Sequence, residues 1–186
     1  MISFPAVGSK KSMYLYQTIS IEKKTHKRTG CEKMFPEMRR KDRILSPENT
    51  ELLLQKGEYG VLSTMGEEYP YGVPVSYVYE NGAVYIHCAI VGSKLENIIR
   101  NPKVSFCVVG ATQVLPGDFT TNYESAVLFG KAEEVFAEEK QRAMELLVQK
   151  YSPEFMQKGL DYIKNADSRV KVIKITADHL TGKSRK

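Results

Sequence analysis

Apolar and polar residues alternate most regularly in residues 71–79, a pattern that predicts a β-strand with two distinct faces. Its odd-numbered positions, all tyrosine or valine, would form one face. The pair Asn81-Gly82 follows, and this pair favours a tight hairpin turn. Residues 84–88 would then return beside the first strand and deliver His87 to its end.

Patterns elsewhere predict further strands and several helices. Strand-like runs occupy 59–64, 104–109, 125–136 (with a bend at Gly130) and 170–175. A capping serine, Ser46, precedes Pro47 and opens a helix that ends at Gly57, with Leu52, Leu53 and Leu54 as its apolar face. Three other helices are expected at 94–100, at 138–151 and from Pro153 to about 164.

Six strands joined mostly as sequential hairpins, with helices at the edges, predict a mainly β (α+β) fold. A small antiparallel barrel is the simplest arrangement, because closure removes exposed strand edges. A chain of 186 residues with 42% hydrophobic content is long enough to bury one core. We therefore expect one folded domain, residues 38–186, preceded by a poorly ordered arm, residues 1–37.

Charge is distributed unevenly between these two parts. Residues 1–43 hold 11 basic and 4 acidic side chains, whereas residues 44–186 hold 16 and 18. A basic arm can bind nucleic acid, but this one lacks aromatic or groove-reading spacing, so we expect it to be solvated. Three scattered cysteines with no Cys-x-x-Cys pair indicate a reducing cytoplasm and no metal site. No stretch is long and apolar enough for a membrane span.

The sequence Gly92-Ser93-Lys94-x-x-Asn97 is the first candidate for chemistry. Glycine permits close approach of a ligand, free N–H groups at a helix N-terminus attract phosphate, and Lys94 adds a positive charge. A structural alternative is equally simple. Ser93 with Glu96 three residues later is a capping box, which would only stabilise the helix.

Two further candidates lie on the predicted strands. Pro74 lacks an N–H, so it belongs at a strand edge or bulge, where the backbone of Val73 and Val75 could meet a flat heterocycle. The alternative is an ordinary edge strand protected by proline. His87 would share a face with Ala83, Tyr85 and Ala89, and it could relay a proton near neutral pH or be purely structural.

Several segments in the same order resemble the nitroimidazole-resistance (Nim-type) branch of the pyridoxamine 5′-phosphate oxidase-like flavoproteins. The resemblance covers residues 38–183. It rests on 38–41, 60–64, 70–77, 85–89, Gly92 with Lys94, 101–104, Asn122-Tyr123-x-Ser125, 129–132 and 181–183.

This resemblance implies a split β-barrel that forms a homodimer with FMN at the subunit interface. The cofactor-binding residues that it implies are Val73, Pro74, Val75, Ser76, His87, Cys88, Ala89, Gly92, Ser93, Lys94 and Asn97, with Asn122, Tyr123 and Ser125 reaching in from the partner subunit. Lys94 and the preceding turn would hold the FMN phosphate. Residues 73–76 would run along the isoalloxazine, and His87 would lie close to the flavin ring.

The expected function is that of a cytoplasmic FMN-dependent oxidoreductase acting on nitroaromatic or similar electron-poor small molecules, with His87 as the catalytic residue. The segment 178–183 lacks the arginine-containing substrate motif of pyridoxamine phosphate oxidase itself, so oxidation of vitamin B6 is not expected. The alternatives are a non-catalytic flavin-binding protein, serving as a store or sensor, and a nucleic-acid binder acting through the arm.

Overall fold

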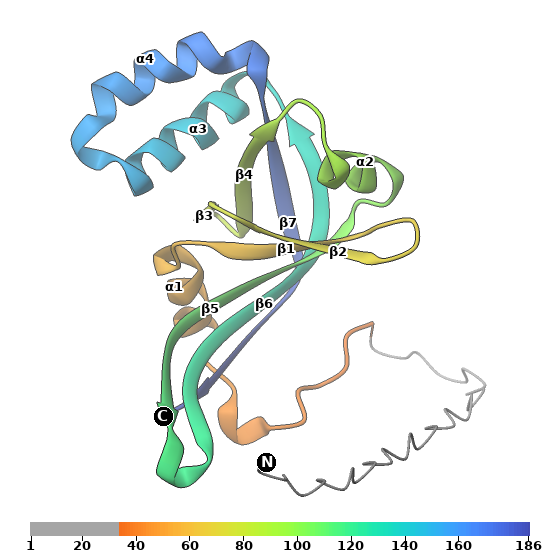
Figure 1. Ribbon diagram of the computed structural model, residues 1–186, viewed down its shortest axis with the longest axis vertical. Helices are drawn as coiled ribbons and strands as arrows, with labels where there is room; N and C mark the ends of the chain where they lie inside the picture. The colour runs from red at the N-terminus through yellow and green to blue at the C-terminus, as the bar shows by residue number, and fades with distance from the viewer. Residues whose placement is uncertain (1–33) are drawn as a thin grey trace, which may run out of the picture. The chain divides into compact units, whose positions relative to one another are not determined.

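The computed structural model describes residues 34–186 as a seven-stranded antiparallel sheet with flanking helices (Figure 1). The strands stand in the order β2-β1-β5-β6-β7-β4-β3. Their bounds are β1 Gly60–Met65, β2 Pro70–Val75, β3 Val78–Glu80, β4 Ala83–Ala89, β5 Lys103–Leu115, β6 Thr120–Val135 and β7 Val170–Arg185. The α-helices are α1 Pro47–Lys56, α2 Ser93–Arg100, α3 Ala137–Tyr151 and α4 Met156–Ala166.

One apolar core collects the inner faces of strands from both ends of the sheet. Its fully or almost fully buried members include Leu54, Leu62, Ile86, Phe106, Leu128 and Ile175. Because β1 and β4 both contribute to this cluster, the sheet curls around it. The edge strands β2 and β3 do not pair with each other in the described residues, so the barrel is split rather than closed. The mainly β fold with flanking helices is the predicted one.

The number of strands was predicted wrongly, because the expected strand 71–79 is two strands. The chain breaks between β2 and β3 at Ser76 and Tyr77. Tyr77 is completely buried, and its hydroxyl donates to the carbonyl of Leu54 at 2.6 Å. Its backbone N–H donates to the hydroxyl of Tyr151 at 2.9 Å instead of to a neighbouring strand. Residues 77–79 are therefore buried consecutively, which ends the alternation.

Two local predictions are confirmed. Asn81 and Gly82, with φ of 51° and 80°, form the two-residue turn between the paired residues Glu80 and Ala83. Helix α1 begins as expected, since the Ser46 hydroxyl accepts from the Asn49 N–H at 3.2 Å. Its apolar face was predicted too broadly, because Leu52 is exposed.

Strands β6 and β7 are longer than predicted and pair along most of their length. The segment 178–183, which lies beyond the predicted strand 170–175, is part of β7 because β6 supplies its backbone partners. The register shifts between Phe129 and Gly130, which confirms the predicted irregularity at this glycine. A side chain at Gly130 would collide with the carbonyl oxygen of Thr176.

A second, smaller core packs α3 and α4 against the outer face of β4 and β7. Lys150, near the end of α3, connects the layer of α3 and α4 to residues outside it by hydrogen bonds. Its ammonium donates to the carbonyls of Gly57 at 2.7 Å and Tyr77 at 3.0 Å, and it lies 4.0 Å from the centre of the Tyr77 ring. Burial lowers the pKa of Lys150 to about 8, so the group is still mainly charged at pH 7.

Replacing Lys150 with methionine should lower the free energy of unfolding by about 1–2 kcal/mol, since two carbonyls lose their donor while the apolar stem is kept. Urea denaturation at pH 7 measures this change. Lys158→Met, on the exposed side of α4, is the matched control and should leave the midpoint nearly unchanged. Equal effects of the two substitutions would contradict the role of Lys150.

The segment before η1 (Lys41–Arg43) contacts the outer face of the sheet. Phe35 stacks on His179 of β7, with ring centroids 4.5 Å apart, although the prediction assigned this residue to the arm. The predicted disorder of residues 1–33 lies outside the described residues. Within the described part, no helix is long and apolar enough to cross a bilayer.

Candidate functional site

Within residues 34–186, no side chain caps the backbone donors at the start of helix α2. Gly92, not Ser93, is the N-cap residue, and its carbonyl accepts from the N–H groups of Leu95 and Glu96. The N–H groups of Ser93 and Lys94 therefore have no acceptor within the helix. The capping-box alternative for Ser93 and Glu96 is wrong, because no side-chain cap bond forms.

Position 92 favours glycine because of its backbone conformation, and not because a side chain would collide with neighbouring atoms. Its φ of 139° lies in the region that favours glycine. A β-carbon added at this position would meet open space. The turn therefore leaves the N-terminus of α2 accessible to a ligand, and that terminus suits an anion.

Two lysines lie within electrostatic range of the buried Cys88 thiol at the end of β4. One is the predicted Lys94, and the other is Lys171, which stands opposite Cys88 in the β4–β7 pairing. Burial raises the pKa of Cys88; Lys94 and Lys171 partly oppose that shift, and the nearby Glu134 carboxylate adds to it. Lys171 also pairs with Glu134 at 2.7 Å. Sequence reasoning missed Lys171, because only the strand pairing brings it here.

Asn97 has a structural partner. It is buried on the inner side of α2, where its Nδ2 donates to the hydroxyl of Thr64 at 3.0 Å. This bond fixes α2 against the end of β1. Asn97 therefore holds the helix that carries Lys94, and direct contact with a cofactor stays a prediction.

His87 lies on the outer face of β4. The strand alternates so that Ile86 and Cys88 point into the core, whereas Tyr85, His87 and Ala89 share the opposite face, as predicted. Further along that face, the Tyr85 hydroxyl donates to Glu139 of α3 at 3.0 Å. His87 is exposed, yet desolvation by the surrounding protein lowers its pKa, so the ring is neutral at pH 7. The side chain of Cys88, which is near Lys94, lies on the opposite face of β4 from His87.

Residues 73–76, which were predicted to bind the cofactor, lie at the edge of the sheet in and just after β2. Val73 and Val75 pack against the main core, while Pro74 and Ser76 are exposed. As predicted for a strand that contains proline, β2 is an edge strand. Ser76, just beyond β2, lines a cavity of about 660 Å³ together with Lys150.

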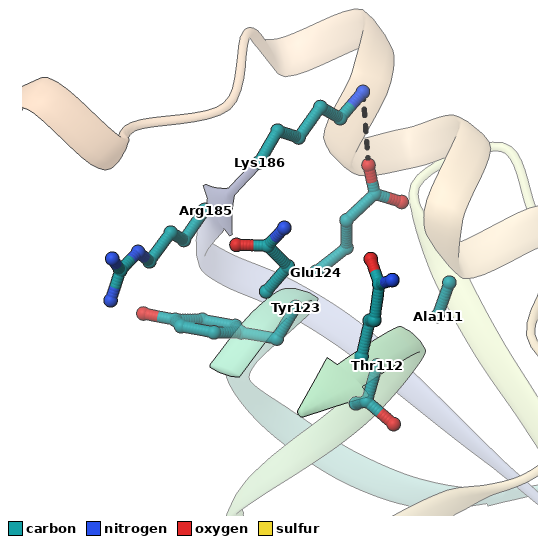
Figure 2. Close-up of a pocket in the computed structure, with 8 residues that line it drawn as sticks. Ala111, Thr112, Tyr123, Glu124, Arg185 and Lys186 are labelled. Atoms are coloured by element: carbon teal, nitrogen blue, oxygen red, sulfur yellow. Dashed lines mark ion pairs between the residues drawn. The ribbon is translucent and has the colours of Figure 1, made fainter. Parts of the chain in front are cut away.

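Asn122, Tyr123 and Ser125 lie at the far end of the sheet from His87. His87 stands opposite Val172, which pairs with Val135 of β6. Tyr123 is twelve positions away along the same strand, roughly 40 Å at about 3.3 Å per residue. Asn122 and Tyr123 line a cavity of about 310 Å³ beside the end of β7 (Figure 2). One chain does not bring these residues to α2.

The chain is thus a split antiparallel β-barrel with flanking helices, in which the N-terminus of α2 is accessible at the end of β4. The chain belongs to the pyridoxamine 5′-phosphate oxidase family, whose model matches residues 46–184.

Solved structures show the same fold at low sequence identity. A candidate 5-nitroimidazole antibiotic resistance protein from Bacteroides thetaiotaomicron is 24% identical, covers 76% of this chain and 86% of its own, and has a TM-score of 0.61. An FAD-binding protein from Mesorhizobium loti is 21% identical, with 77% and 98% covered and a TM-score of 0.56. A conserved hypothetical protein from Mycobacterium tuberculosis is 17% identical, with 80% and 90% covered and a TM-score of 0.69. No curated protein matches the chain.

Proposed function

We propose that the protein is an FMN-dependent oxidoreductase that reduces nitroaromatic, 5-nitroimidazole-like or similar electron-poor small molecules. The observation that carries this proposal is the uncapped N-terminus of α2, with Lys94 beside it, in a chain of the pyridoxamine 5′-phosphate oxidase family. The names of the relatives from M. loti and B. thetaiotaomicron support a flavin and a nitroimidazole, respectively.

The residues at α2 fit the phosphate of FMN. The free N–H groups of Ser93 and Lys94, the open space above Gly92 and the positive charges of Lys94 and Lys171 all favour a dianion. The edge strand β2 would border the flat ring, with Pro74 preventing the strand from pairing on its free side. Bound flavin would supply the hydride-transfer chemistry, and the protein would supply orientation.

A cytoplasmic homodimer would complete the site. Because Asn122, Tyr123 and Ser125 lie far from α2 along β6, they would reach the cofactor of a second subunit. The outer face of the sheet offers an apolar surface for such a contact. Val61 on β1, Cys107 on β5 and Val127 on β6 lie in register there and are each partly exposed.

His87 would position the substrate next to the flavin. With its pKa lowered, the imidazole is neutral at pH 7 and can donate one N–H to an oxygen of a nitro group. Such a donor would stabilise negative charge that develops on that oxygen during reduction. A low pKa makes His87 a poor source of a proton at neutral pH, so positioning is the role that we favour.

An absorbance spectrum of the purified protein and a steady-state assay test this proposal together. Visible flavin bands and turnover with reduced nicotinamide and a 5-nitroimidazole are expected. Flavin bands without turnover would favour the storage or sensor alternative. A colourless, monomeric protein that does not bind added FMN would refute the proposal.

A further inference from the structure

Lys150 is a half-buried amine that opens onto a cavity lined by the last residues of α1 and α3. The cavity has a volume of about 660 Å³. Lys56, Glu58 and Tyr59 line it from one side, and Lys150 and Tyr151 line it from the end of α3. Within residues 34–186, Lys150 forms no ion pair, so its amine is held by neutral groups alone.

This cavity lies at the opposite end of β1 from helix α2. Lys150 donates to the carbonyl of Gly57, just before β1, whereas Asn97 fixes α2 to Thr64 near the end of β1. From its first residue to Thr64, β1 extends roughly 13 Å at about 3.3 Å per residue. Ser76, which follows β2, also lines the cavity, but the start of α2 does not. The amine is therefore distinct from the phosphate site proposed at α2.

Two backbone carbonyls and one aromatic ring hold the amine in place. Its Nζ donates to Gly57 at 2.7 Å and to Tyr77 at 3.0 Å, and it lies 4.0 Å from the centre of the Tyr77 ring. A neutral amine has two N–H groups, so it can keep both hydrogen bonds while its lone pair is free to react. Burial lowers the pKa of Lys150 to about 8, which makes this neutral form accessible near neutral pH.

We propose that Lys150 is an acylation site for small acyl thioesters that enter this cavity. The amine nitrogen attacks the carbonyl carbon of the thioester, so that a C–N bond forms and the C–S bond breaks. The electron pair of the C–S bond leaves with the thiolate, which takes up the proton that the amine releases. A lysine desolvated by the protein acts as a nucleophile in this way. This site goes beyond the proposed flavin site and does not depend on it.

Acylation also weakens the attachment of α3. An amide has one N–H and no charge, so one of the two carbonyls loses its donor and the Tyr77 ring loses its cation. Because Lys150 connects α3 to the segment before β1, the acylated protein should unfold at a lower concentration of urea. The modification would thus make the stability of the fold depend on the supply of activated acyl groups.

Treatment of the full chain with S-acetyl-N-acetylcysteamine at pH 7.5, followed by peptide mass spectrometry, tests the inference. About a quarter of the Lys150 side chains are free amine at this pH, against about a thousandth for an ordinary lysine. A less basic amine is also a weaker nucleophile, so Lys150 should be acetylated about tenfold or more faster than Lys56 and Lys158. These two lysines are matched controls, because both are exposed and Lys56 lines the same cavity.

Equal rates of acetylation at Lys150 and Lys56 in the folded protein would overturn the inference. A preference for Lys150 that persists in concentrated urea would also overturn it, because the fold must create the preference. Acetylation should lower the urea midpoint of the wild type but not that of Lys150→Arg, which has no amine at this position; an equal fall in both would contradict the structural effect. Saturation with FMN should leave the rate at Lys150 unchanged, and protection by FMN would refute a site separate from the flavin.

Discussion

Lys94→Ala should weaken FMN binding about ten- to one hundredfold, as expected when a charge-assisted contact worth about 1.5–3 kcal/mol is removed. Lys94 is the predicted phosphate residue at the uncapped start of α2. The two backbone donors there remain in the variant, so binding should be reduced and not abolished. Titration of the protein into free FMN, followed by flavin fluorescence, gives the dissociation constant.

Two further variants make this measurement specific. Lys171→Ala should also weaken FMN binding, but less, because Lys171 already pairs with Glu134. Lys164→Ala, on α4, removes the same charge from an exposed helix and should leave the dissociation constant unchanged. An unaltered FMN affinity in Lys94→Ala would contradict the placement of the phosphate at the start of α2.

His87→Ala should lower the rate of 5-nitroimidazole reduction by about one hundredfold while FMN stays bound, the size of effect seen when one donor to a developing oxyanion is lost. Because His87 is exposed on β4, its replacement by alanine should not unfold the protein, so loss of folding would not explain such a change in rate. The rate is measured at saturating reduced nicotinamide, with flavin content determined from absorbance. Unchanged turnover would exclude the histidine from the mechanism.

The pH dependence separates positioning from proton donation. Desolvation lowers the pKa of His87 below its usual 6.5, so the neutral form dominates above that pH. Because the protonated ring donates from both nitrogens, a positioning role does not depend on the protonation state and predicts a rate that changes little between about pH 8 and about pH 5.5. His87→Gln, which keeps an N–H donor but does not titrate, should retain more activity than His87→Ala. A wild-type rate that climbs on acidification, while the rate of His87→Gln does not, would indicate that the protonated ring is the active form.

Elements fixed by neighbouring residues could be predicted from the sequence. The Asn81-Gly82 turn requires positive φ at two adjacent positions, and these residue types tolerate it. The start of α1 depends on Ser46 and Pro47 alone. Such signals lie within a few residues of the structure that they determine.

Elements fixed by distant residues could not be predicted. The break between β2 and β3 depends on Tyr151, which is 74 residues from Tyr77. Residues 178–183 look like a polar tail, and they form a strand only because β6 provides the partner. The alternation of apolar and polar residues along the sequence indicates neither of these contacts.

The same division applies to the candidate site. The contiguous run from His87 to Lys94 was found from its residue types, and the structure brings it to one end of β4. Lys171 was missed, because its neighbour Cys88 is assigned by strand register. Residue type therefore locates chemistry that is local in the chain, and topology is needed for the rest.

The proline in β2 also constrains how copies of this protein can meet. A rim strand with continuous N–H groups can recruit a strand from another molecule and grow into a fibril. Pro74, next to the last residue of β2, removes one N–H from that row, so association should proceed through sheet faces, leaving a finite particle instead of a polymer.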